Sequence, residues 1–285
     1  MVSPSSRRKA VRHLVQRFRV SERRACRLLD QQRSTQRYKP LPPDYELRLV
    51  KRMNQLAQEH PRWGYRMVCT LLRSEGWLVN RKRVERLWRL EGNRVPPRRS
   101  KASGRKAEGA STNAAWNLPA KYPHHIWSFD FMVTRTRGGG PIRILNVVDE
   151  YTRLAVGCRV ARSIGTRDVI AELDLLFAQH GKPKIIRSDN GREFIAASLR
   201  SWLAERGVTL ALIEKASPQQ NCFVERFNGT MREEKLNGED FDSVLEARVV
   251  LREWALNEYN NLRPHRGHGM MTPRRFADSW KAGRT

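Results

Sequence analysis

Apolar residues in the first third of the chain recur every three or four positions, which is the spacing of one face of an α-helix. Residues 7–37 follow this pattern on both sides of a break, and Ser21 at the break is a suitable N-cap for the helix after it. Further helices are predicted at 45–60, 64–76 and 80–92, the last with Asn80 as its N-cap. The pattern predicts an all-α N-terminal part.

From residue 121 onward the pattern changes to short apolar runs with the length and composition of β-strands. Five strands are predicted, at 125–133, 143–151, 153–161, 184–189 and 208–214. Helices are predicted at 166–181, at 194–207 and, after the last strand, at about 218–236 and 243–262. Three consecutive strands followed by alternating helix and strand predict an α/β fold, with a mixed five-stranded sheet and flanking helices.

Charge is distributed unevenly along the chain. Its 285 residues hold 55 Lys and Arg against 29 Asp and Glu, a net charge of +26, and 29 of the basic residues but only 9 of the acidic ones lie in residues 1–120. Such an excess favours a polyanionic partner, most commonly nucleic acid, although ribosomal-type RNA binders and membrane-surface proteins are also basic. The N-terminal part is therefore predicted to hold the polyanion.

The two helices around Ser21 resemble a helix-turn-helix, and the first turns of the helix at 80–92 are equally basic. Two interpretations fit these helices: they contact DNA, or they are ordinary helical pairs with a solvated basic face. The net charge favours DNA contact. The residues that would make it are Arg23, Arg24, Arg27, Arg81, Lys82, Arg83 and Arg86.

A basic linker separates the helical part from the strand-rich part. Residues 93–120 have no apolar period and are rich in Pro, Gly, Ser and Arg. The sequence thus predicts four segments: a helix-turn-helix-like basic segment (1–40), a helical DNA-binding domain (41–96), the linker (97–120) and an α/β core with C-terminal helices (121–285).

Cysteine spacing and hydropathy indicate the cellular compartment. The four cysteines lie far apart without a C-x-x-C pair, which is typical of reduced thiols rather than of a zinc cluster or a disulfide framework. No apolar run reaches membrane-spanning length, and the N-terminus lacks the apolar core of a signal peptide. We therefore expect a cytoplasmic protein that does not interact with a membrane.

Two aspartates occupy positions where a carboxylate is costly. Asp130 lies inside the apolar run 125–133, and Asp189 ends the run 184–189. An acid in a strand is unfavourable unless it is paired or binds a metal. For Asp189, which precedes Asn190-Gly191, turn formation is the alternative role. If the two strands are neighbours, the two acids meet at one edge of the sheet and can hold a metal ion together.

A third acid, Glu225, lies on the helix predicted at about 218–236. The 35 residues between Asp189 and Glu225 are enough for a helix, a strand and a turn to bring that helix back to the other acids. Asn221, one helical turn earlier, shares the face of Glu225 and is a candidate to orient it or to bind substrate. Arg226 and Arg232 are candidates to hold DNA phosphates, or else are solvated helix arginines.

Five motifs in this order are similar to those of the OrfB-type insertion-sequence transposases of the IS-three family. They are WSFD at Asp130, NVVDEYTR, RSDNGREF at Asp189, SPQQNCFVERFNG at Glu225, and YNNLRPH followed by TP..F at 259–276. The resemblance covers nearly the whole chain, and the 35-residue gap is that of the family. The sequence departs from the family at Cys222, where a small Gly or Ala is usual, and at His268, where Leu is usual.

The resemblance implies a DDE retroviral-integrase-like core of RNase H-like fold, with Asp130, Asp189 and Glu225 as catalytic and metal-binding residues. It further implies two Mg²⁺ ions, for which Mn²⁺ can substitute, and 3′-end cleavage and strand transfer on double-stranded DNA. The implied partners are an OrfA-type companion protein and further copies of the chain on DNA, and the implied location is the bacterial nucleoid. Two alternatives stay open: a nuclease of the same fold that only hydrolyses, and a DNA-binding regulator whose core has decayed.

Overall fold

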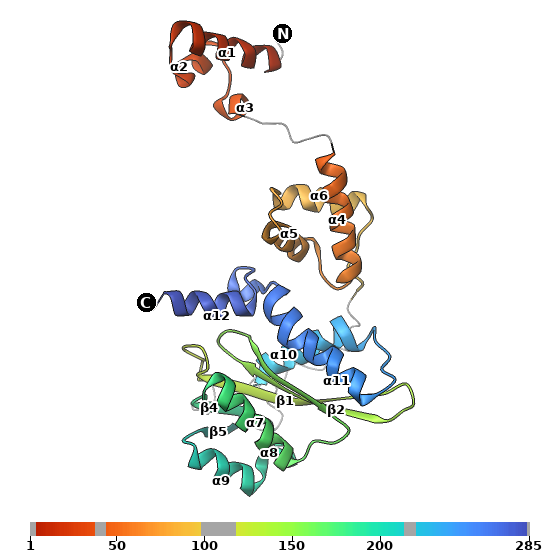
Figure 1. Cartoon of the computed structure of the whole chain (residues 1–285). Helices are drawn as coiled ribbons and strands as arrows, with labels where there is room; N and C mark the ends of the chain where they lie inside the picture. The colour runs from red at the N-terminus through yellow and green to blue at the C-terminus, as the bar shows by residue number, and fades with distance from the viewer. Residues whose placement is uncertain (1–3, 38–43, 98–117, 214–220, 284–285) are drawn as a thin grey trace, which may run out of the picture. The chain divides into compact units, whose positions relative to one another are not determined.

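A computed structural model describes residues 4–37, 44–97, 118–213 and 221–283 (Figure 1). The chain divides into two compact units, Met1–Arg52 and Met53–Thr285. None of the described helices combines the length and apolar composition that crossing a membrane requires.

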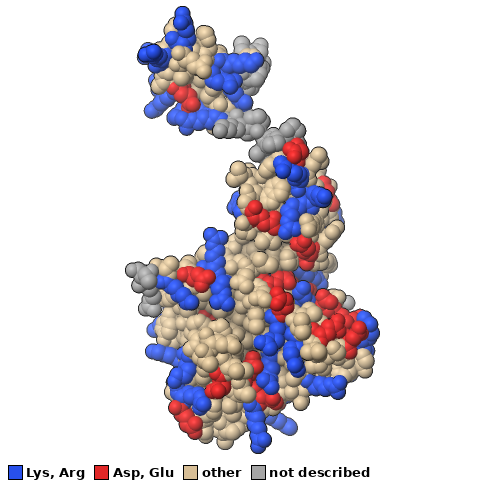
Figure 2. Space-filling model, viewed as in Figure 1, with Lys and Arg blue, Asp and Glu red and all other residues tan. Residues whose placement is uncertain are grey.

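The first unit contains the helices α1 (Pro4–Phe18), α2 (Glu22–Leu28) and α3 (Arg33–Arg37). Ser21 caps α2 as predicted, because its hydroxyl accepts a hydrogen bond from the Arg24 N–H at 3.3 Å. Residues 7–37 were predicted to be helical with one break, but the structure has a second one: α2 ends at Leu28, Asp30 adopts a left-handed conformation with φ +48°, and α3 is a separate helix. Lys and Arg side chains cover much of the visible face of this unit (Figure 2).

Three helices predicted from the apolar pattern follow: α4 (Tyr45–Glu59), which spans the boundary between the units, α5 (Tyr65–Ser74) and α6 (Arg81–Leu90). Asn80 caps α6 as predicted, accepting a hydrogen bond from the Arg83 N–H at 2.7 Å. The buried side chains of this helical region in the second unit are Met53, Leu56, Trp63, Val68, Cys69, Leu72, Val79, Val84, Leu87 and Trp88.

The sheet has five strands in the order β3-β2-β1-β4-β5. They are β1 (Ile126–Arg135), β2 (Pro141–Asp149), β3 (Ala155–Ala161), β4 (Ile185–Ser188) and β5 (Thr209–Leu212). The first three pair antiparallel, whereas β1 with β4 and β4 with β5 pair parallel. The predicted mixed five-stranded sheet is therefore confirmed (Figure 1).

Alternating side chains bury both faces of this sheet. Trp127 and Phe129 of β1 pack on one face, in a cluster with residues of α7 (Thr166–His180) and α9 (Ala197–Glu205). Met132 packs on the other face, in a cluster with residues of α10 (Cys222–Met231), α11 (Val244–Glu253) and the π-helical segment η3 (Trp254–Leu262). The arrangement is a sheet between two layers of helices, as in RNase H-like folds.

Two features differ from the sequence-based expectation, and one predicted boundary cannot be compared with the structure. The helix predicted at 194–207 is two helices, α8 (Arg192–Ile195) and α9, because Ala196 between them is extended with ψ 133°. The start predicted near Pro218 lies outside the described residues; the described part of α10 begins at Cys222 and continues into the π-helical segment η2 (Arg232–Leu236). A C-terminal helix, α12 (Pro273–Ala282), was not predicted.

Candidate active site

Strand pairing brings Asp130 and Asp189 to adjacent positions. β1 and β4 run parallel with Ser128 opposite Arg187, and each aspartate lies two residues further along the chain. Residues two apart on a strand point to the same face. Asp130 therefore lies on the face that α10 covers, with Asp189 beside it where β4 ends.

Each of the two carboxylates is held by local hydrogen bonds. The Asp130 carboxylate accepts from the Phe131 N–H at 2.8 Å and from Asn228 Nδ2 at 2.9 Å. Asp189 Oδ1 accepts from the Gly191 N–H at 3.0 Å. This last contact is the turn interaction that the sequence allowed for Asp189, so turn formation and a position beside Asp130 occur together.

The surroundings of Asp130 oppose the ionisation of its carboxyl group. Burial, then repulsion from Asp189 and to a smaller degree from Glu225, raise the pKa of Asp130 from 3.8 to about 6. The hydrogen bonds from Phe131 and Asn228 act in the opposite direction but do not cancel this effect. The three predicted acids therefore interact electrostatically across the sheet and α10.

Glu225 lies in the first turn of α10 and is exposed. Within the parts of the chain that the structure describes, no three His, Cys, Asp or Glu side chains are grouped closely enough to hold a metal ion. The donor chemistry nevertheless fits a hard divalent cation, because carboxylate oxygens are the ligands Mg²⁺ prefers. A bound cation would also relieve the repulsion that raises the pKa of Asp130.

Comparison with known proteins identifies the family. Residues 120–218 and 206–273 match two models described as integrase core domain, and residues 44–101 match an HTH-like domain. The chain is 35% identical over 280 residues to an uncharacterized 39.2 kDa protein of insertion element IS476 from Xanthomonas euvesicatoria, covering 98% of this chain and 79% of that one. It is 36% identical over 267 residues to a 31.7 kDa protein of IS407 from Burkholderia multivorans, covering 94% of each. The chain belongs to the IS-three family of insertion-sequence transposases.

Among solved structures, the catalytic core domain of HTLV-2 integrase in complex with magnesium aligns with 55% of the transposase and 97% of that chain, at 18% identity and a TM-score of 0.45. Membership of the family makes the transposase a polynucleotidyl transferase that acts on DNA. The motifs that predicted this class were short, but their order along the chain was specific.

A buried ion pair lies below the two aspartates. Arg187 donates to both carboxylate oxygens of Glu150 at 3.0 and 3.1 Å, and Ser128 donates to the same carboxylate. Ser128 and Arg187 are the residues that precede Asp130 and Asp189 by two positions on their strands. Glu150, which follows β2, thus connects β1 through Ser128 and β4 through Arg187, next to the two aspartates.

The predicted DNA-contacting arginines and lysine lie mostly at the surface. Of the candidates on α2, α6, α10 and η2, all are exposed except Arg83, which is half-buried, and Asn221, which is buried. Asn221 Nδ2 donates to the Phe129 carbonyl at 3.5 Å, so in this structure it joins the start of α10 to β1. Their contacts with DNA stay predictions.

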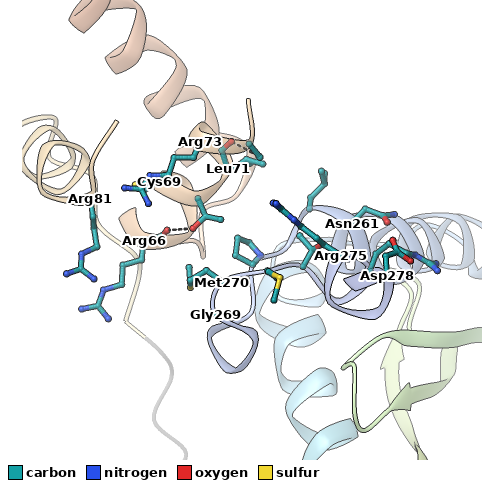
Figure 3. A pocket seen from close by; sticks show the side chains of 17 residues that line it. Arg66, Cys69, Leu71, Arg73, Arg81, Asn261, Gly269, Met270, Arg275 and Asp278 are labelled. Atoms are coloured by element: carbon teal, nitrogen blue, oxygen red, sulfur yellow. Dashed lines mark hydrogen bonds between the residues drawn. The ribbon is translucent and has the colours of Figure 1, made fainter. Parts of the chain in front are cut away.

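A basic cleft lies between α5 and the C-terminal segment of the second unit (Figure 3). Its volume is about 770 Å³, and five of the lining residues are arginines: Arg66, Arg73, Arg81, Arg274 and Arg275. No ion pair joins Arg81, Arg274 or Arg275 to an acid in the described ranges. Asp278 is the one acid among the residues that line the cleft.

The two departures from the family pattern have different surroundings. His268 is buried and stacks on Phe276 with ring centroids 3.8 Å apart, so it fills a packing position as the usual Leu would. Cys222 is half-buried at the start of α10, and burial raises the pKa of its thiol. His265, in the last of the five motifs, is half-buried, and the loss of water around its ring, followed by the charge of Arg263, lowers the pKa of its imidazole to about 3.

Sequence analysis missed Asn146 and Asn228. Asn146 lies in the centre of β2, opposite Asp130, and Asn228 lies one helical turn after Glu225. The signal for Asn146 was available, because a polar residue inside the apolar run 143–151 is as costly as Asp130 is in its own strand.

Proposed function

We propose that this transposase cuts the 3′ ends of its insertion sequence and joins them to a new DNA site. Asp130, Asp189 and Glu225 are the residues that would carry out this chemistry by holding divalent metal ions. The adjacency of Asp130 on β1 and Asp189, which follows the last residue of the neighbouring parallel strand β4, carries the proposal, together with the effect of Glu225 on the pKa of Asp130.

The expected ions are two Mg²⁺, with Mn²⁺ as a substitute. When bound, they would activate a water or a 3′-hydroxyl and stabilise the leaving oxygen of a phosphodiester. The chain's own contribution is to hold the ligands. Phe131 and Asn228 each occupy one oxygen of the Asp130 carboxylate, and each oxygen keeps a second lone pair for a metal.

Further proposals concern the organisation of the chain and its partners. Residues 1–40 and 41–96 would grip double-stranded DNA, 97–120 would link them to the core, and 121–285 would hold the catalytic site. The family resemblance supports assembly of several copies on the element ends and the target, with an OrfA-type companion. The transposase would then act at the nucleoid in the bacterial cytoplasm.

Joining, rather than cutting, is the reaction that tests the proposal. Given element-end DNA, Mg²⁺ and the companion protein where required, we expect products in which a 3′ end is covalently linked to a new strand. A 3′-deoxy end should block this joining without preventing earlier nicking, because the attacking hydroxyl is then missing.

Two other outcomes correspond to the alternative functions. Nicked products alone, under every condition that supports cutting, would indicate a hydrolytic nuclease. DNA binding without any cutting in Mg²⁺ or Mn²⁺ would indicate a regulator with a decayed core.

A further inference from the structure

A pair of buried amides connects Asp130 to the middle of β2. Asn146 is directly opposite Asp130 in the antiparallel β1–β2 pairing, and α10 places Asn228 next to both. Asn146 Nδ2 donates to Asn228 Oδ1 at 2.8 Å, and Asn228 Nδ2 donates to Asp130 Oδ2 at 2.9 Å. The three side chains form one directed chain of hydrogen bonds that ends on the carboxylate.

The direction of this chain matters because an amide has a donor end and an acceptor end. If the Asn228 amide were reversed, its oxygen would face the Asp130 carboxylate and the two would repel each other. The Asn146 donor end rules this out, since it requires the oxygen of Asn228 on its own side. An apolar side chain at position 146 would fill the same space but would not select between the two orientations of the Asn228 amide.

The surroundings of Asn146 fix its own orientation in turn. Its Nδ2 faces two weak acceptors, Met132 Sδ at 3.5 Å and Met231 Sδ at 3.7 Å. Its side chain is fully buried, and Oδ1 has no hydrogen-bond partner among the described residues. A buried acceptor without a partner is a cost that an apolar residue at this position would avoid.

We propose that Asn146 is a positioning residue, which orients the Asn228 amide so that its donor end faces Asp130 and holds that carboxylate for a divalent metal ion. This inference rests on the proposed metal-dependent function. It explains why a polar residue with an unpaired oxygen occupies the apolar centre of β2. Partners of metal ligands commonly act in this way, by fixing the ligand before the ion arrives.

Metal binding by the full-length protein tests the inference without relying on catalysis. Mn²⁺ serves as the probe, with free Mn²⁺ followed by electron paramagnetic resonance. We expect Asn146→Leu to weaken Mn²⁺ binding by about 10- to 100-fold. Its melting temperature without metal should stay close to that of the wild type, because the substitution removes the unpaired Asn146 Oδ1 but leaves Asn228 Oδ1 without its donor.

Asn260 provides a matched control. It is also a buried asparagine, but its amide bonds only to backbone atoms, accepting from the Ala155 N–H and donating to the carbonyls of Ala155 and Leu256. Asn260→Ala should therefore lower the melting temperature and leave the Mn²⁺ affinity of the folded protein unchanged. The two asparagines are thus expected to show opposite patterns.

The outcomes separate this inference from the function on which it rests. If Asn146→Leu binds Mn²⁺ as the wild type does while Asp189→Asn does not, the positioning role is refuted and the metal site stands. If Asn146→Leu lowers only the melting temperature, as expected for Asn260→Ala, Asn146 is a structural residue. If the wild type itself binds no Mn²⁺, the proposed metal dependence fails, and the inference fails with it.

Discussion

Asp130 shows how a functional position can cost stability. Its carboxylate is largely buried, lies beside Asp189, and has a pKa raised from 3.8 to about 6. A raised pKa means that the folded protein binds this proton more tightly than the unfolded chain does. Folding stability is therefore lost as the pH rises from 3.8 through about 6, and the full cost is present above that window.

Asp130→Asn should accordingly stabilise the protein in the absence of metal. The substitution removes the charge but keeps the shape, so the melting temperature in a chelating buffer should rise at pH 8 and change little at pH 4. The shift in the pKa of Asp130 from 3.8 to about 6 corresponds to about 3 kcal/mol. This value is the upper limit of the gain in unfolding free energy, because the carboxylate keeps some contact with water. A lower melting temperature at pH 8 would mean that the carboxylate is stabilised in the fold by contacts that the pKa does not reflect.

Glu150 is expected to have the opposite effect on stability. It is fully buried and paired with Arg187, so removing it takes from a buried guanidinium the carboxylate to which it donates two hydrogen bonds. Glu150→Ala should cost about 3–5 kcal/mol of unfolding free energy, measured by urea denaturation. Arg137→Ala is the control, since its ion pair with Asp242 is exposed on both sides and should contribute less than about 1 kcal/mol. Equal costs for the two variants would contradict this assignment.

At the scale of elements, the basic cleft between α5 and the C-terminal segment can be tested as a DNA-backbone contact. Arg274 and Arg275 begin α12 and line the cleft. The double variant Arg274→Glu, Arg275→Glu should bind DNA more weakly than the wild type. Its affinity should also depend less on salt: the slope of log affinity against log salt concentration should become shallower by about 0.9 for each phosphate that the variant no longer neutralises. Arg167→Glu with Arg200→Glu makes the same change in charge on α7 and α9, on the other side of the sheet, and should have a smaller effect. Equal effects would show that only net charge matters.

The sequence predicted elements well where one local pattern decided them. The apolar runs of β1 to β5, the helix α6 and the capped start of α2 were located within a few residues. Local rules failed where a single backbone angle interrupts a helical pattern, as at Ala196 between α8 and α9. Helix α12 was missed although Thr272 and Pro273 form a recognisable start, with the Thr272 hydroxyl accepting from the Arg275 N–H.

The site was predictable only in part, for a related reason. Asp130 and Asp189 stood out because a carboxylate in an apolar strand needs an explanation, and their order and spacing resembled a family. Asn146 and Asn228 depend on a contact between residues 82 positions apart, which no local pattern reveals. Asn221 was a candidate to orient Glu225 or to bind substrate, and its bond to the carbonyl of Phe129 in β1 could not be read from either role. Tertiary hydrogen bonds, rather than element positions, are what the single sequence did not provide.

At the scale of the whole molecule, charge and catalysis are assigned to different parts of the chain. Residues 1–120 hold 29 of the 55 Lys and Arg, whereas all three predicted catalytic acids lie beyond residue 121. DNA affinity should therefore depend mainly on counterion release by the N-terminal part, and cleavage on a few carboxylates of the core. This division predicts that the two activities can be separated by one substitution.

Asp189→Asn is the substitution that should separate them. It removes one charge beside Asp130 and keeps the acceptor for the Gly191 N–H, so the fold should be preserved. Strand cleavage in Mg²⁺ should fall by more than about 100-fold, since even outer partners of metal ligands typically cost 10- to 100-fold. The affinity for element-end DNA should stay within about twofold of the wild type and decline as steeply with salt, because phosphate contacts made by Lys and Arg are unchanged. Retained cleavage in the purified variant would exclude Asp189 from the metal site. Loss of DNA binding would show that the residues of the catalytic site also contribute to binding the DNA.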